Sequence, residues 1–465
     1  MRSRIVAMSA TLTLAASFTL SLAPVAFAQP AATAELPIED CKLTSTGVGT
    51  FNEGFAVDAD AASATGTLVA QAIYAEFPDH PAGGPEEFWL EHLHADAMQA
   101  AANLETQSGG RLDVVVREPA DWITMPKDTT AYPASDDGSW SNTKFLEFVT
   151  DAIAAAEPTI DFTGSDVIWV FYPQVAPLAT RGQASNFVPP TPDDPPMRAI
   201  TLPKAGSYAA ISSLIVHETG HTFSMPDLYD TSPGGAAGYF GSWDPMSDSW
   251  GDGLALEAWE FAGWHVWRFG WIDDAQVRCL DPAASVELTL DAITRRGSSV
   301  IAVIPTGDHR AVVVESRKAE RFDAAIARPG VLAYVIDTTV ESGKGPIRVA
   351  PRDGTVFPTD STGFADATLR PGDRYADPVG AFTVTVTATS ETSDTVRIAP
   401  ANVPTEPPSK SPAQPAATGA TSTLPATGTD PGVLVALSIE LLLAGTVVMI
   451  AWSRRPAQTD RPTPR

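Results

Sequence analysis

The sequence is poor in positive charge. Lysine and arginine together number 30, against 56 aspartates and glutamates, and the formal net charge is −26. Proteins that bind nucleic acid or adhere to anionic membranes do so through basic patches. The shortage of basic residues therefore argues against both kinds of partner. It is typical of a soluble surface that faces the outside of a cell.

Cysteine is also scarce, because Cys41 and Cys279 are the only two in 465 residues. In a secreted protein, an even pair of cysteines predicts a disulfide. Such a bridge would tie the start of the mature chain to the far side of the segment that carries the chemistry described below. Two unpaired, buried thiols are the alternative.

Two further patterns are absent. The sequence has no internal repeat and no EF-hand spacing, the commonest signature of a calcium loop. Calcium binding by Asp230, Asp244 or Asp248 is therefore left as an alternative without support from a motif. The hydrophobic fraction of 44% is ordinary for a globular protein, and the length allows two or three domains.

The N-terminus carries a targeting pattern. Two arginines precede an apolar run over residues 5–22, and Ala26-Phe27-Ala28 follows as a small-residue cleavage site. Residues 1–28 are therefore predicted to be a secretory signal peptide, and the mature chain is expected to begin near Gln29. An uncleaved membrane anchor is the alternative.

The C-terminus carries a second pattern. Leu424-Pro425-Ala426-Thr427-Gly428 precedes an apolar stretch, 433–452, that is long enough to span a bilayer and is followed by two arginines. The order and spacing within residues 424–465 resemble the LPxTG cell-wall sorting signal of Gram-positive surface proteins. The resemblance implies that sortase cleaves between Thr427 and Gly428 and links Thr427 to peptidoglycan. A single-pass membrane protein with an accidental LPATG is the alternative.

Between these two signals, the first part of the chain alternates between strand and helix patterns. Strand-like segments occur at 67–74, 111–116, 166–172 and 198–202, and helical periodicity occurs at 85–104 and 143–156. This alternation predicts an α/β domain, with helices packed on a sheet, over residues 65–280. The segment 29–64 has mixed signals, and a propeptide there is left open.

The pattern changes after Cys279. Five β-rich segments separated by turn residues follow, at 286–290, 300–304, 311–315, 331–336 and 382–387. They predict an all-β domain over residues 281–400. Residues 401–423 are rich in proline, alanine, serine and threonine, and they are predicted to form a semi-extended stalk.

The segment that carries chemistry begins at His217 and reads H-E-T-G-H. On a helix, positions i and i+4 share a face, so His217 and His221 can direct two imidazoles at one point. Two imidazoles at this spacing suit a tetrahedral zinc ion. Glu218 can reach a metal-bound water without binding the metal. The apolar residues 209–216 predict that this helix is buried.

A catalytic zinc ion needs a third protein ligand and one open position for water. Asp227 follows His221 by six residues, with Pro226 before it as a sign that the helix has ended. The spacing resembles the metzincin pattern H-E-x-x-H-x-x-G-x-x-[HD], which implies that Asp227 is the third ligand. Zinc would lower the pKa of its water to about 7, and Glu218 would pass that water's proton to the leaving amine.

Further stretches make the resemblance more specific. Met246, within Trp243-Asp244-Pro245-Met246-Ser247, resembles the Met-turn that underlies the zinc of metzincins. The stretches HETGHTFSMPDLYD, GSWDPM and WHVWRFGWID resemble the M6 family of secreted bacterial metallopeptidases, the immune inhibitor A type. The similarity covers about residues 67–336. It implies a metzincin-like catalytic domain (a mixed sheet with an active-site helix), zinc, and endopeptidase activity on proteins. Plain core packing is the alternative for Met246.

The sequence departs from the family pattern in one turn. Ser224 stands where the family has glycine, and a positive φ is unfavourable for a residue with a Cβ. The turn that would bring Asp227 to the metal is therefore the weak point of the interpretation. Glu257 or Glu260 is the alternative third ligand.

The other histidines are interpreted as surface or packing residues, and most aromatic residues as structural. His92 and His94 are two residues apart and do not share a helix face, and the remaining three are isolated, namely His80, His265 and His309. Six tryptophans between residues 243 and 271 are predicted to pack around the site. A structural role is also favoured for Tyr229 and Tyr239, although either could stabilise an oxyanion.

Together these features predict a zinc-dependent endopeptidase that is anchored to the cell wall of a Gram-positive bacterium and acts on extracellular proteins. The alternative is a surface adhesin or binding module on a peptidase-like scaffold. The presence of His217, Glu218 and His221 together argues against that alternative. A zinc enzyme that acts on peptidoglycan fits the location but not the family resemblance.

Overall fold

A six-stranded sheet forms the first part of the computed structural model, and its strands are β1 (Gly66–Glu76), β2 (Leu112–Arg117), β3 (Ile123–Thr124), β4 (Val167–Pro173), β5 (Gln183–Val188) and β6 (Met197–Lys204). Their order is β2-β1-β4-β6-β5, and β3 pairs with β1. The pairings are parallel except at β5, which runs antiparallel to β6 at the edge. Every residue of β4 is buried, as expected for a central strand with both faces covered.

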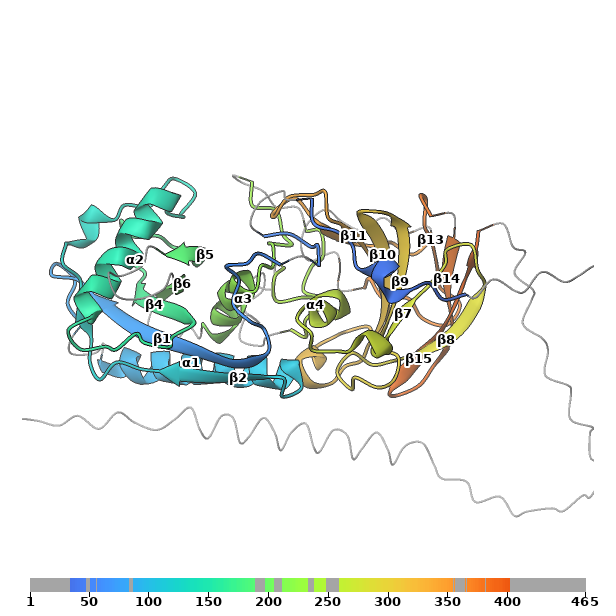
Figure 1. Ribbon diagram of the computed structural model, residues 1–465, viewed down its shortest axis with the longest axis horizontal. Helices are drawn as coiled ribbons and strands as arrows, with labels where there is room; N and C mark the ends of the chain where they lie inside the picture. The colour runs from blue at the N-terminus through green and yellow to red at the C-terminus, as the bar shows by residue number, and fades with distance from the viewer. Residues whose placement is uncertain are drawn as a thin grey trace, which may run out of the picture. The chain divides into compact units, whose positions relative to one another are not determined.

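Three helices pack on this sheet: α1 (Glu87–Ser108), α2 (Asn142–Ala156) and α3 (Ser212–Thr222). Alternate residues of β4 point to opposite faces. Ile168 and Val170 join a core with Phe148 of α2, whereas Trp169 joins a second core with Ile215 of α3 and with residues of α1. The helices therefore cover both faces, and the fold is mixed α/β (Figure 1).

Two further sheets follow from residue 277. One has the order β12-β11-β10-β9-β7 and the other β13-β14-β15-β8. Their strands are β7 (Val277–Cys279), β8 (Val286–Asp291), β9 (Ile301–Gly307), β10 (Arg310–Arg317), β11 (Gly330–Asp337), β12 (Ile347–Val349), β13 (Arg374–Ala376), β14 (Phe382–Thr389) and β15 (Ser393–Pro400). β7 precedes residue 281, where the β-rich region was predicted to begin, because it pairs with β9.

The five-stranded sheet contributes to two cores. Val312 and Val314 of β10 pack with Val384 and Val396 of the four-stranded sheet. Val313, which points the other way, packs with the aromatic cluster that reaches α3. The period of two along a strand thus connects the β-rich region to the helix that carries the histidines.

The shorter elements are the helix α4 (Gly263–Arg268) and the 3-10 turns η1 (Ile38–Cys41), η3 (Thr129–Ala131), η4 (Asp274–Gln276) and η5 (Arg321–Asp323). Cys41 and Cys279 form a disulfide across 238 residues. Beside it, the backbone N–H of Leu36 donates to the carbonyl of Cys279 at 2.9 Å. The N-terminal segment therefore lies along β7.

The structure describes residues 34–46, 51–55, 57–82, 87–188, 197–204, 211–232, 238–247, 259–353, 355, 364, 366–380 and 382–401. All of them belong to one compact unit, Met1–Pro404. The predicted signal peptide, stalk and sorting signal lie outside these residues, Thr427 and Gly428 included. In the described part, no helix combines the length and the apolar character needed to cross a membrane.

Candidate metal centre

Helix α3 is buried almost throughout its length. It packs against α1 and against strands β5 and β6, and ten of its residues, His217, Glu218 and His221 among them, are buried. The prediction of a buried helix is confirmed from Ser212 onward, whereas residues 209 and 210 lie outside the described part of the chain. A helix enclosed in this way holds its side chains rigidly, which suits a site that must keep its geometry.

Asp227 lies close to both histidines of α3. Its Oδ1 atom is 3.2 Å from Nε2 of His217 and 3.3 Å from Nε2 of His221. Donor atoms that share one tetrahedral zinc at about 2.0–2.1 Å are about 3.3 Å apart. The two distances therefore match a common zinc ion. Within the described ranges, these three residues are the only group of three or more candidate ligands.

Backbone carbonyls orient both imidazoles. Nδ1 of His217 lies 2.8 Å from the carbonyl oxygen of Pro245, and Nδ1 of His221 lies 2.7 Å from that of Met225. A carbonyl only accepts hydrogen bonds, so each Nδ1 must carry the proton. The lone pair is then on Nε2, which faces Asp227 and is available to a metal ion.

The turn after α3 forms in spite of Ser224. This residue has a φ of 68°, and the N–H groups of Ser224 and Met225 donate to the carbonyls of His221 and Gly220, at 2.8 and 3.2 Å. These are the two hydrogen bonds of a Schellman motif, a common helix C-terminus. The serine therefore adopts the left-handed conformation expected of glycine, and Asp227 reaches the histidines.

A loop of the β-rich region holds Asp227 in place. The backbone N–H of Asp227 donates to Oγ of Ser342 at 2.9 Å, and the carbonyl of Asp227 accepts from the N–H of Gly343 at 2.9 Å. Sequence reasoning missed these two residues. No local signal could reveal them, because more than a hundred positions separate them from the aspartate.

Glu218 is enclosed between α3 and the edge strand. Burial is the largest influence on its carboxyl and raises the pKa of Glu218 to about 8, with His217 acting in the opposite direction and Asp227 adding to the rise. A Cβ at Gly182, just before β5, would lie 2.3 Å from Oε1 of Glu218. The glycine therefore allows the strand to approach this carboxyl closely.

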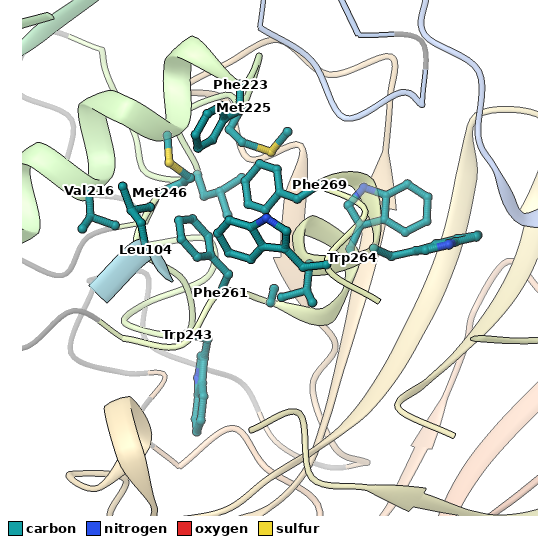
Figure 2. Packing of buried hydrophobic residues seen from close by; sticks show 14 of the residues in the cluster. Leu104, Val216, Phe223, Met225, Trp243, Met246, Phe261, Trp264 and Phe269 are labelled. Carbon is teal, nitrogen blue, oxygen red and sulfur yellow. The ribbon is translucent and has the colours of Figure 1, made fainter. Parts of the chain in front are cut away.

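Met246 packs directly under α3. A Cβ on Gly220 would lie 2.4 Å from its sulfur, so the glycine of the H-E-T-G-H motif makes room for the methionine. Figure 2 shows Met246 among Val216, Leu104 and Phe261. Met246 is thus a core residue, and the preceding Pro245 supplies the carbonyl that orients His217.

Of the remaining candidates in the described residues, Tyr229 lies near the histidines, whereas Glu260 and Tyr239 have partners elsewhere. Glu260 is buried beside Arg296 and Asp323, so Asp227 and not Glu260 accompanies the histidines. Glu257 and Asp248 fall outside the described residues. Tyr239 stacks under Arg348 at 4.1 Å, whereas the ring of Tyr229 lies 6.0 Å from that of His217.

Two carboxylates named as calcium alternatives have protein partners. Asp230 accepts from the N–H of Ser232. Asp244 accepts from the N–H groups of Met246 and Ala262 and contacts His265. His265 is fully buried, as a packing residue would be, but it is also paired on both ring nitrogens.

Comparisons with known proteins give no family assignment. No family model and no curated protein matches the chain, so the resemblance to the M6 family stays a prediction. Archaemetzincin from Methanopyrus kandleri, a solved structure, shares 13% identity over 44% of this chain and 94% of its own, with a TM-score of 0.25.

OgpA from Akkermansia muciniphila is a second solved protein with weak structural similarity to this chain. The wild-type form shares 10% identity over 72% of this chain and 94% of its own, with a TM-score of 0.24. A catalytically inactive form in complex with an O-glycopeptide shares 12% over 70% and 90%, with a TM-score of 0.25. Scores this low carry no weight for fold or function, so any functional conclusion depends on the geometry of the site.

Proposed function

We propose that the protein is a zinc-dependent endopeptidase. The observation that carries the proposal is the convergence of Oδ1 of Asp227 on Nε2 of both His217 and His221 at 3.2 and 3.3 Å. The donor set of two imidazoles and one carboxylate leaves the fourth position of a tetrahedral ion open, which distinguishes catalytic zinc sites from structural ones.

In the proposed hydrolysis, the zinc ion and Glu218 have different roles. When bound, zinc would acidify a water molecule and polarise a carbonyl group. Glu218 follows the first ligand on the same buried helix, so its carboxylate would take the proton from the attacking water. The same carboxyl group would then return that proton to the amine of the cleaved bond.

The position of β5 supports a peptide substrate. This edge strand pairs with β6 and with no other strand in the described part of the chain, and its start lies against Glu218 through Gly182. An extended peptide could add to its outer edge by main-chain hydrogen bonds. Its scissile bond would then pass close to the base.

We also propose that this activity is located outside the cell, on the cell wall. The signal-peptide pattern of residues 1–28 and the sorting pattern of residues 424–465 support this location. The disulfide between Cys41 and Cys279 suits an oxidising compartment. Sortase and peptidoglycan would then be partners through Thr427.

The test is the variant Glu218→Gln. We expect it to bind zinc as the wild type does, about one equivalent, and to cleave casein at least about 100-fold more slowly. The control is Glu157→Gln, at an exposed carboxylate beyond α2. Casein cleavage by Glu218→Gln at the wild-type rate would contradict the mechanism. A wild-type protein that binds no zinc would favour the binding module instead.

A further inference from the structure

Four buried charged side chains form a cluster beside the candidate metal centre. They are Glu53, Asp244, His265 and Arg268, and their side chains are at most 1% exposed. His265 lies 2.8 Å from Asp244 through Nδ1 and 3.0 Å from Glu53 through Nε2. Nη1 of Arg268 is 3.3 Å from Glu53. Such burial of charge is costly unless the charges are paired.

The cluster is ionic at neutral pH. Both ring nitrogens of His265 face carboxylates, and a neutral imidazole has only one N–H to donate. Burial by itself would lower the pKa of His265, but Asp244 and Glu53 outweigh it and raise the pKa to about 10. The protonated His265 and Arg268 therefore face the carboxyl groups of Asp244 and Glu53.

One arm of the cluster leads to His217. Asp244 accepts the N–H of Met246 through Oδ1 at 2.7 Å and that of Ala262 through Oδ2 at 2.7 Å. The first bond spans Pro245, whose carbonyl accepts from Nδ1 of His217 at 2.8 Å. The second bond ties Asp244 to the N-cap residue of α4. Glu53 therefore acts on this ligand through His265 and Asp244.

The other arm leads to His221. Nη1 of Arg268 lies 3.2 Å from the sulfur of Met225, and the carbonyl of Met225 accepts from Nδ1 of His221 at 2.7 Å. Glu53 is paired with both Arg268 and His265. Glu53 therefore belongs to both series of contacts, the one that leads to His217 and the one that leads to His221.

The backbone around Glu53 is fastened to the same elements. The carbonyl of Glu53 accepts from Nε1 of Trp264 at 3.2 Å, and the ring of Phe51 lies 4.9 Å from that of His221. Further along, the N–H of Ala62 donates to the carbonyl of Thr222 at 2.7 Å. Removal of this segment would leave His265 and Arg268 buried without their shared carboxylate, which is strongly destabilising.

We propose that Glu53 is a positioning residue for both metal-binding histidines, and that the segment that carries it stays in the active protein and is not removed as a propeptide. This inference rests on the proposed function. Groups that orient metal ligands typically account for a 10- to 100-fold change in metal affinity or activity.

The experiment measures zinc affinity in chelator-buffered zinc for the wild type, Glu53→Gln and Glu39→Gln. We expect Glu53→Gln to bind zinc about 10-fold more weakly and to lose kcat with little change in KM, because it alters the ligands and not the peptide-binding edge. The control Glu39→Gln, from the same segment but exposed, should match the wild type. A purely structural role would lower the Tm without changing zinc affinity, and that result would overturn the proposal.

Two further measurements test the proposal if the Glu53→Gln variant fails to fold. Arg268→Met interrupts the arm to His221, and it should also bind zinc more weakly; wild-type affinity would contradict that arm. The intact mass of the active wild-type protein should include Glu53, and full activity in a chain that begins after it would overturn the proposal. Absence of zinc from the wild type would refute the proposed function, whereas equal affinity in wild type and Glu53→Gln would refute this inference alone.

Discussion

Ser224 forms the turn that brings Asp227, the proposed third ligand, to His217 and His221. Its φ of 68° places a Cβ where left-handed backbone costs roughly 1–2 kcal/mol. Its hydroxyl is buried and has no hydrogen-bond partner, which adds a desolvation cost. The Schellman hydrogen bonds and the packing of Phe223 and Met225 outweigh both costs.

Replacement of this residue by glycine should therefore stabilise the protein. We expect Ser224→Gly to raise the free energy of unfolding by about 1 kcal/mol, because the relief of strain and of the buried hydroxyl exceeds the added flexibility of the unfolded chain. Denaturant unfolding of the metal-free protein measures this, with zinc affinity expected to stay the same. A less stable Ser224→Gly would show that the serine side chain is favourable here.

At the scale of elements, the contact between α3 and β5 places Glu218, the proposed base, against the strand that is proposed to bind the substrate. Gly182 makes this contact possible, because a Cβ there would lie 2.3 Å from Oε1 of Glu218 and 2.8 Å from Cδ1 of Leu214. The Glu218 carboxylate can rotate away from an added Cβ, but it would then leave its present position against the start of β5. The close packing of β5 on α3 therefore depends on the absence of a side chain at Gly182.

Gly182→Ala should reduce catalysis without removing the metal. A displacement of about 1 Å at a reacting group can cost about 100-fold, so we expect kcat to fall by at least about 10-fold while zinc content is unchanged. The matched control is Gly307→Ala at the end of β9, where a Cβ would meet nothing within 4 Å. Steady-state kinetics of both variants test this prediction. A kcat of Gly182→Ala equal to that of Gly307→Ala would refute the role of Gly182.

At the scale of the whole molecule, buried charges join the β-rich region to the segments that surround the candidate metal centre. Arg317 of β10 pairs with Asp323 at 2.7 Å and Glu315 at 3.0 Å, and it donates to the carbonyls of Trp243 and Glu260 at 3.1 Å. The carboxyl of Glu260 itself accepts no hydrogen bond. Its burial, together with Asp323, outweighs the nearby arginines and raises the pKa of Glu260 to about 7.

This raised pKa should make the stability of the whole protein depend on pH. Between about pH 4.5 and 7 the unfolded chain has lost the proton of Glu260 while the folded protein keeps it, so the free energy of unfolding falls as pH rises. Glu260→Gln removes this dependence. Its stability relative to the wild type should increase by as much as roughly 3 kcal/mol from pH 4.5 to 7. Denaturant midpoints at the two pH values test this, and a constant difference would contradict it.

Several features follow from local sequence alone. The spacing of His217 and His221 places them on one helix face, because the period of a helix does not depend on its surroundings. The alternation of strands and helices predicted the mixed α/β fold, since apolar periodicity reports which faces are buried. With two cysteines in the chain, Cys41 and Cys279 also had only one possible intramolecular partner each.

Other features were decided only by tertiary structure. Asp227 was one of several candidate ligands until the turn at Ser224 and the loop at Ser342 brought it to the histidines. Glu53 and His265 are 212 positions apart and carry no pattern that links them. Long-range packing determines such contacts, because a buried charge finds its partner only when the folded chain brings the two together.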